Sequence, residues 1–279
     1  MTNPIADPLV EVPDSDTETD LVLVETTPEG AATVTINRPA KKNAFNDAVI
    51  RSLSQAFEVL HGAEGVRIVF VRGAGGSFSA GADLEWMKGA IERTEDDNRA
   101  DAMAMAVMLK RLYDLPALTV ALVEGGAFGG GAGLAAACDM AIATADAKFA
   151  FSEVKLGLIA ATVSPYVVAA IGPRKARRLF ATGAPFDAAY AREIGLIDEV
   201  VADAAALGAA QAKLAADILA CAPQAMDESK RLVEHIVGRH LDHALMVDTA
   251  HRIAAKRVGD EGQEGVRAFL EGRKPPWAQ

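Results

Sequence analysis

Two glycine-rich segments are the first features of this 279-residue sequence that could do chemistry. Residues 73–81 and residues 125–131 each follow a predicted buried strand and precede a predicted helix start. The first backbone N–H groups of a helix have no intrahelical partner, and the helix dipole adds a partial positive charge there. Small residues let a ligand approach the backbone closely. Two such loops side by side could direct two N–H groups at one developing oxyanion.

Other kinds of glycine-rich site fit these segments less well. Neither segment ends in the Gly-Lys-Ser/Thr of a phosphate-binding loop, and residues 76–81 do not read Gly-x-Ser-x-Gly, the pattern of a nucleophile elbow. Residues 131–136 match the dinucleotide pattern G-x-G-x-x-A, but they follow several glycines without a clear strand–turn junction. For either loop alone, close packing of a helix on a strand is the preferred interpretation of the glycines.

The elements that position these loops follow from the hydrophobic pattern. Strands and helices alternate up to about residue 155 and helices dominate after it, which predicts an α/β fold with a helical C-terminal region. The expected strands are 21–25, 32–36, 66–71, 118–123 and 140–144, and the expected helices are 44–60, 98–113, 187–194, 204–221, 223–237 and 241–258. Further helix starts are expected at Ser164-Pro165 and Gly172-Pro173.

Composition divides the chain and limits its partners. Residues 1–20 are acidic and contain three prolines, so we predict a disordered tail at 1–20, a core at 21–200 and a helical region at 201–279.

The formal charge of −10 argues against general binding of nucleic acid. Two cysteines exclude a disulfide framework. Because the first 37 residues lack Lys and Arg, and no apolar run reaches about 20 residues, we expect a cytoplasmic protein that does not bind membranes.

Four segments resemble the enoyl-CoA hydratase/isomerase (crotonase) superfamily in their order and spacing. They are residues 36–44 (INRPAKKNA), 78–84 (FSAGADL), 127–131 (AFGGG) and 152–158 (SEVKLGL). The resemblance extends from about residue 21 to residue 275. It implies a crotonase-like spiral of ββα units, with a helical C-terminal region that builds homotrimers, often paired into hexamers.

The resemblance also implies an acyl-CoA thioester as the substrate, so that coenzyme A is part of the substrate and no separate cofactor is needed. The thioester oxygen would accept hydrogen bonds from the backbone N–H groups of Ala80 and Gly130. The pantetheine and acyl path would be lined by Ala80, Gly81, Ala82 and Asp83. Asp83 has a competing role as the cap of a helix N-terminus, which we prefer.

Basic residues that match the family's motif would hold the adenine end of coenzyme A. Lys41 and Lys42 lie at this position, and a solvated charge pair is the alternative interpretation. Lys274 is a weaker candidate for the coenzyme A phosphates, across a subunit boundary. No metal is expected, because His235, His240 and His243 lie on a mostly polar helical stretch that is typical of a solvated surface.

The number of active-site carboxylates bears on which reaction is possible. Hydratases of the family commonly use two glutamates; Glu153 matches the second, whereas Gly133 stands at the position of the first. Hydration of a 2-enoyl thioester needs a base that takes a proton from water and a source of a proton for the α-carbon. A single carboxylate suffices to move a proton from C2 to C4, which converts a 3-enoyl-CoA into its 2-enoyl isomer. The second proton-transfer group of a hydratase stays open.

A longer stretch favours hydration. Residues 152–158, 163–168 and 170–173 resemble the branched-chain subgroup that contains bacterial methylglutaconyl-CoA hydratases of leucine breakdown. We therefore predict hydration or dehydration of a 2-enoyl-CoA through an oxyanion-stabilised enolate. The alternatives are an isomerase that uses Glu153 alone and, from another class, a non-catalytic acyl-CoA-binding or scaffold protein.

Overall fold

The computed structural model describes residues 21–278, so the predicted disordered tail at 1–20 lies outside the described residues. Its centre is a sheet of order β1-β2-β3-β4-β6-β9, in which β1 is antiparallel to β2 and the other neighbours are parallel. The strands are β1 (Val22–Thr26), β2 (Ala31–Ile36), β3 (Ile68–Gly73), β4 (Leu118–Val123), β6 (Met140–Thr144) and β9 (Glu199–Val201). A second sheet joins β5 (Gly126–Phe128), β7 (Lys148–Ala150) and β8 (Phe186–Asp187).

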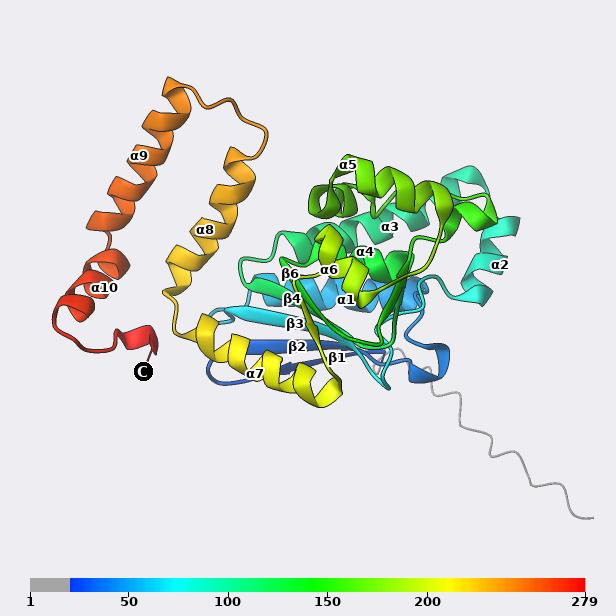
Figure 1. Cartoon of the computed structure of the whole chain (residues 1–279), viewed down its shortest axis with the longest axis horizontal. Coiled ribbons are helices and arrows are strands. Elements are labelled where there is room, and N and C mark those ends of the chain that lie inside the picture. Colours follow the sequence, from blue (N-terminus) through cyan, green and yellow to red (C-terminus); the bar gives the residue numbers. More distant parts are fainter. Residues whose placement is uncertain (1–20, 279) are drawn as a thin grey trace, which may run out of the picture.

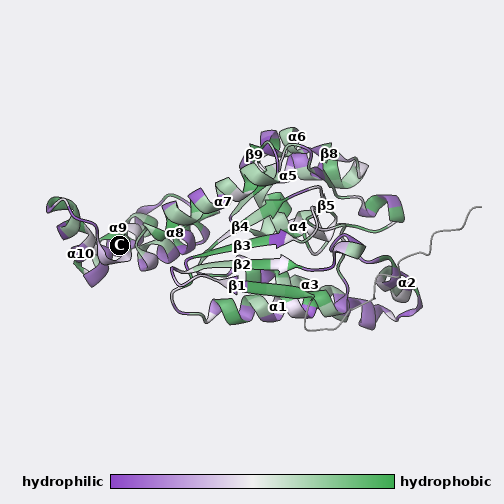
Figure 2. Ribbon diagram, turned by 90° about the horizontal axis from the view of Figure 1, so that it is seen from below, coloured by the Kyte–Doolittle hydropathy of each residue, from purple (hydrophilic) through white to green (hydrophobic). Residues whose placement is uncertain are grey.

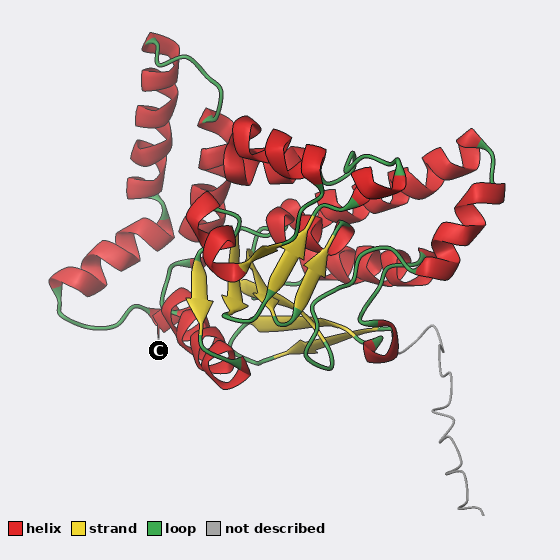
Figure 3. Ribbon diagram, turned by 45° about the vertical axis from the view of Figure 1, so that its right-hand side comes forward, coloured by secondary structure: helices red, strands yellow, loops and turns green. Residues whose placement is uncertain are grey.

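Helices cover both faces of the central sheet (Figures 1 and 3). They are α1 (Asp47–His61), α2 (Leu84–Glu92), α3 (Glu95–Tyr113), α4 (Gly130–Ala137), α5 (Ser164–Thr182), α6 (Ala188–Ile194), α7 (Ala204–Leu219), α8 (Pro223–Ile236), α9 (His243–Val258) and α10 (Asp260–Leu270). Short 3₁₀ helices are η1 (Pro39–Lys41), η2 (Glu153–Leu156) and η3 (Pro276–Ala278). The predicted α/β fold with a helical C-terminal region is confirmed.

Strand β3 shows why the central strands are hydrophobic throughout. Its side chains alternate between two cores: Val69 and Val71 pack with α1 and α3, whereas Ile68 and Phe70 pack with Leu207 of α7. A strand that is buried on both faces has no face in contact with water, so its sequence does not alternate between apolar and polar residues. Figure 2 shows the result, because the strand ribbons are mostly hydrophobic in colour. The boundary predicted at residue 200 therefore falls before α7, a helix that belongs to the packing of the sheet.

Helix α1 begins three residues later than the pattern predicts, for a local reason. Phe45 uses its backbone groups to pair with the first glycine segment. Asn46 then caps the helix, since its side chain accepts a hydrogen bond from the N–H of Val49 at 2.9 Å. Helix α5 contains both predicted starts, because Gly172 has a φ of +75° and interrupts the helix before Pro173.

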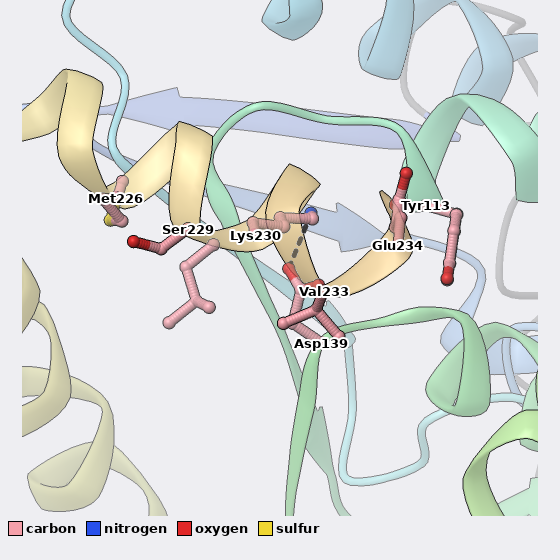
Figure 4. Close-up of a pocket in the computed structure, with 8 residues that line it drawn as sticks. Tyr113, Asp139, Met226, Ser229, Lys230, Val233 and Glu234 are labelled. Carbon is pink, nitrogen blue, oxygen red and sulfur yellow. Dashed lines mark ion pairs between the residues drawn. The ribbon is translucent and has the colours of Figure 1, made fainter. Parts of the chain in front are cut away.

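Helices α8, α9 and α10 form an arm that extends away from the sheet (Figure 1). Lys230 anchors α8: its Nζ lies 2.7 Å from Asp139 Oδ2 and donates to Leu115 O at 2.7 Å. A cavity of about 390 Å³ lies beside this ion pair, and its lining includes Tyr113, Met226 and Val233 (Figure 4). The cavity is lined by α8, the end of α3 and the start of β4, and neither glycine segment lines it.

Among the described residues, no single helix is long and apolar enough to cross a membrane. Helices α7 and α8 together satisfy the length and composition, but they are bent by 103° relative to each other.

Candidate active site

The two glycine-rich segments lie side by side. Ser79 pairs with Ala127 in a parallel bridge, in which the N–H of Ser79 donates to Gly126 O at 2.9 Å and the N–H of Phe128 donates to Ser79 O at 3.0 Å. The approach requires glycine, because a Cβ on Gly81 would lie 2.7 Å from Phe128 O, and Gly81 has a φ of +86°. Two loops that are far apart in sequence are therefore in direct contact.

The backbone N–H groups in the first segment and directly after it, at Ala82, are not equivalent. The N–H of Ala80, which the sequence analysis assigned to the thioester oxygen, donates to Lys42 O at 2.9 Å. Phe45 pairs with Gly81 O and with the N–H of Asp83, so the intervening N–H of Ala82 points away from Phe45. No described residue accepts a hydrogen bond from it. Ala82, rather than Ala80, carries the N–H group that is available to a ligand.

The second available N–H belongs to Gly130. This residue is the first of α4, and no described residue accepts a hydrogen bond from its N–H. Gly129 precedes it with a φ of +49°, which a glycine adopts readily. A Cβ on Gly130 would lie 3.1 Å from both the Phe45 ring and Met105 Cε, so these two side chains pack against Gly130 on the side where a side chain would project. The helix dipole adds to its partial positive charge.

Glu153 places a carboxyl group next to the second segment. It lies on η2, and its Oε1 would be 3.1 Å from a Cβ on Gly129. Its Oε2 is buried and has no hydrogen-bond partner among the described residues. Burial raises the pKa of Glu153 above its ordinary value, because the charged form is poorly solvated. Such a carboxylate is a stronger base than an exposed glutamate and has an oxygen free to accept a proton.

Two other carboxylates near the loops are already engaged. Asp83 caps α2 by accepting from the N–H of Glu85 at 2.8 Å, and it pairs with Arg38. Glu124 pairs with Arg72 at 3.3 Å. The capping role that the sequence analysis preferred for Asp83 is therefore confirmed. Its buried side chain supports the loop instead of lying open to a ligand.

Asn43 is a residue that the sequence analysis missed. Its side chain is fully buried and ties the segment 38–44 to the first glycine segment. Its Oδ1 accepts from the N–H of Arg38 at 2.9 Å, and its Nδ2 donates to Ala74 O at 2.8 Å and to Ser77 O at 2.6 Å. Asn43 has a φ of +56°, a conformation that asparagine tolerates better than most residues. Its place inside the INRPAKKNA motif was the available signal.

The lysines that were predicted to hold coenzyme A lie in two different regions of the fold. Lys41 and Lys42 are exposed, and the carbonyl of Lys42 fixes the first glycine segment through Ala80. Lys274 lies near the C-terminus, where Trp277 O accepts from Arg67 Nη1 at 3.2 Å. Arg67 precedes β3, whereas the glycine segment follows β3. Within one chain, the C-terminal segment is therefore held at the end of the sheet opposite the loops.

His235 and Cys138 are less suited to chemistry at a site. His235 pairs with Asp248, with 2.8 Å between Nε2 and Oδ2. No group of three His, Cys, Asp or Glu residues within 21–278 is arranged to hold a metal ion. Burial raises the pKa of the Cys138 thiol, which keeps it protonated and unreactive. Glu153, Ala82 and Gly130 are therefore the candidate groups of the site.

Comparison with known proteins gives the family of the chain. Residues 26–279 match the family model described as enoyl-CoA hydratase/isomerase. The chain is 34% identical over 246 residues to the enoyl-CoA hydratase EchA19 of Mycobacterium tuberculosis, covering 87% of this chain and 91% of that protein.

Solved structures show the same fold. An enoyl-CoA hydratase from Shewanella pealeana superposes with a TM-score of 0.87 at 38% identity, over 92% of this chain and 96% of the other. An enoyl-CoA hydratase/isomerase from Marinobacter aquaeolei gives a TM-score of 0.87 at 33% identity, over 93% and 99%. With the resemblance carried by nearly the whole chain, the protein belongs to the enoyl-CoA hydratase/isomerase family and has the crotonase fold.

Proposed function

We propose that the protein is a hydratase that adds water across the double bond of a 2-enoyl-CoA thioester. The observation that carries the proposal is the buried Oε2 of Glu153, which has no hydrogen-bond partner within residues 21–278 and lies next to the loop whose Gly130 N–H is available there. A base that faces an oxyanion site can activate water for attack on a conjugated thioester. The relatives described as enoyl-CoA hydratases support the same reaction.

The two N–H groups supply the electrostatic part of the reaction. Attack of water at C3 moves negative charge onto the thioester oxygen and produces an enolate. The N–H groups of Ala82 and Gly130 would donate hydrogen bonds to this oxygen, in a site where the backbone already holds them in place. Loss of one such donor typically costs about 2.7–4 kcal/mol of transition-state stabilisation.

Glu153 alone can carry out both proton transfers of the hydration, from water and to C2. Its carboxylate takes one proton from the water as the C3–O bond forms, and the resulting carboxylic acid gives that proton to C2 of the enolate. The carboxylate is then regenerated, and one water has been added. This sequence answers the question raised by Gly133, because it requires no second carboxyl group.

Isomerisation is the second candidate, and it is favoured by the same single carboxyl group. Glu153 would remove a proton from C2 of a 3-enoyl-CoA and return it at C4, through the same enolate. We place hydration first because residues 152–173 resemble the branched-chain, methylglutaconyl-type subgroup. A branched 2-enoyl-CoA is accordingly the substrate class that we propose, with Lys41 and Lys42 at the adenine end of coenzyme A.

We further propose that the protein works as a homotrimer or hexamer. The arm leaves large apolar side chains exposed on α9 and α10, among them Ile253, Val258 and Phe269. Exposed apolar surface of this kind is typical of an interface between subunits. Size-exclusion chromatography with light scattering would test the assembly, and a monomer at micromolar concentration would contradict it.

The reaction is tested by mass spectrometry of the coenzyme A products. Purified protein is incubated with crotonyl-, 3-methylcrotonyl-, 3-methylglutaconyl- and a 3-enoyl-CoA, with Glu153→Gln in parallel. A product heavier by one water, formed by the wild type and absent with Glu153→Gln, supports the hydratase. Conversion of the 3-enoyl-CoA at unchanged mass would establish the isomerase instead. Binding without any conversion would favour a non-catalytic acyl-CoA-binding protein.

A further inference from the structure

We infer that Val163 occupies the space that a second active-site carboxylate would need, and that it thereby makes Glu153 the sole proton carrier of the site. The observation is a steric one at Gly133. A Cβ added to Gly133 would lie 2.0 Å from Val163 Cγ1 and 2.4 Å from Val163 Cβ. Such distances do not occur between real side chains, so the structure accepts no side chain at residue 133 while Val163 is present.

The direction of this missing side chain matters for catalysis. The N–H of Gly133 donates to Gly129 O at 3.0 Å, so the two residues are separated by the first turn of α4, which Gly129 precedes as the N-cap. A Cβ on Gly129 would lie 3.1 Å from Glu153 Oε1, and a Cβ on Gly133 would lie 2.0 Å from Val163 Cγ1. Val163 and the Glu153 carboxyl group therefore lie next to residues that are joined by one hydrogen bond at the start of α4. A glutamate at residue 133 would bring a second carboxylate close to the first.

Val163 is firmly held in this position. Its side chain is 2% exposed, and it is the N-cap residue of α5, where its carbonyl accepts from the N–H of Val167 at 3.1 Å. A β-branched side chain also has few alternative rotamers. The valine cannot turn aside to admit a larger residue at 133. A change from one carboxylate to two therefore requires both positions to change together.

The catalytic part of this inference rests on the proposed use of Glu153 as the base, whereas the steric part does not. With one carboxyl group, protons leave and return through a single group, whose pKa is raised because burial outweighs a backbone hydrogen bond that lowers it. A second carboxylate within about 4–6 Å would disfavour ionisation of the pair further.

The steric part is tested by a double-mutant cycle of thermal stability that needs no substrate. Gly133→Ala should lower Tm by about 5 °C or more in the wild-type background. In a Val163→Gly background the same substitution should cost much less, because the blocking side chain is gone. The matched control is Gly208→Ala in α7, where a Cβ meets nothing within 4 Å and Tm should not fall. An equal loss of Tm in both backgrounds would overturn the inference.

The catalytic part is tested by the pH dependence of kcat/KM, with whichever reaction the wild type performs. The variant Gly133→Glu with Val163→Gly is compared with Val163→Gly alone. The acid limb of the double variant should move to higher pH by about one unit. The negative charge of one carboxylate disfavours ionisation of the other and so raises its pKa. If the acid limb is unchanged although Gly133→Ala costs less Tm in the Val163→Gly background, Val163 has a packing role only and the catalytic part of the inference is wrong. Absence of any activity in the wild type would instead contradict the proposed function.

Discussion

Arg38 and Asp83 form a buried ion pair that joins the basic motif to the site. Arg38 Nη1 lies 3.0 Å from Asp83 Oδ2, and the side chains are only 4% and 8% exposed. Arg38 also donates to Ala44 O at 2.8 Å. Burial alone would raise the pKa of Asp83, but the N–H of Glu85 and the Arg38 guanidinium outweigh it, so this pKa lies below its ordinary value. The pair fixes where α2 begins, two residues after the available N–H of Ala82.

Substitution Asp83→Ala should destabilise the protein by about 3–5 kcal/mol, because it removes the carboxylate opposite a buried guanidinium. The free energy of unfolding is measured by urea denaturation at pH 7. The control is Asp96→Ala, since Asp96 is exposed and pairs with Arg99 on the surface, where about 0–1 kcal/mol is expected. Because the Asp83 pKa is lowered by folding, its contribution should be present at neutral pH and disappear as the pH falls through that lowered pKa. Equal effects of the two substitutions would contradict this role.

Glu153→Gln should slow turnover by about 10²–10⁴-fold, because it removes the general base and keeps the side-chain shape. The wild-type kcat/KM should fall as the pH drops through a pKa above 4.5, the ordinary glutamate value, because burial raises the Glu153 pKa. Steady-state kinetics across a pH series measure both effects. An acid limb at or below the ordinary value would show that the carboxyl group is solvated in the working enzyme.

The same substitution should raise thermal stability at neutral pH. Folding raises the pKa of Glu153, so the folded protein holds the proton more tightly than the unfolded chain does. The wild type should therefore lose stability relative to Glu153→Gln as the pH rises from the ordinary glutamate range through the raised pKa. Differential scanning calorimetry at several pH values checks this, and a Tm advantage of the glutamine variant that grows at low pH would be the opposite result.

Gly81→Ala should disrupt the contact between the two loops. The added Cβ would lie 2.7 Å from the backbone oxygen of Phe128, which cannot move without separating the segments. We expect turnover to slow by about 10-fold or more, since full loss of one oxyanion donor costs about 2.7–4 kcal/mol. Gly76→Ala is a matched control, because Gly76 also has a positive φ but a Cβ there meets nothing within 4 Å. Similar kinetic losses in both variants would assign the effect to backbone strain rather than to the loop contact.

Lys41→Ala with Lys42→Ala should raise KM for acyl-CoA by about 5- to 10-fold, with little change in kcat, because exposed ion pairs contribute about 0.2–1 kcal/mol each. The effect should shrink at high salt. It should also be absent for the corresponding pantetheine thioester, which lacks the adenine end. A control is Lys213→Ala, an exposed lysine on α7 that pairs with Asp217. An equal KM increase with the pantetheine thioester would place the two lysines elsewhere.

Short elements mark the limit of what the sequence pattern could predict. The five predicted strands all exist: β3, β4 and β6 are apolar runs that are buried nearly throughout, whereas β2 alternates between buried and half-buried residues and β1 is largely exposed. Strands β5, β7 and β8 have three, three and two residues, which is too short for a hydrophobic period to be read. Helix α10 was not predicted either; it contains Gly262 and Gly265, which weaken helix propensity.

Residue types alone indicated the two glycine-rich loops, because close backbone approach is a property of glycine itself. Glu153 as the catalytic carboxylate and Gly133 as the position of a missing one were predictions from the resemblance to the family, which matches these residues to its two glutamate positions. Folding determines which N–H is available, Ala82 rather than Ala80, and which side chain fills the space beside Gly133. Both depend on partners that are distant in the chain, Lys42 and Val163, which only the folded backbone brings into contact.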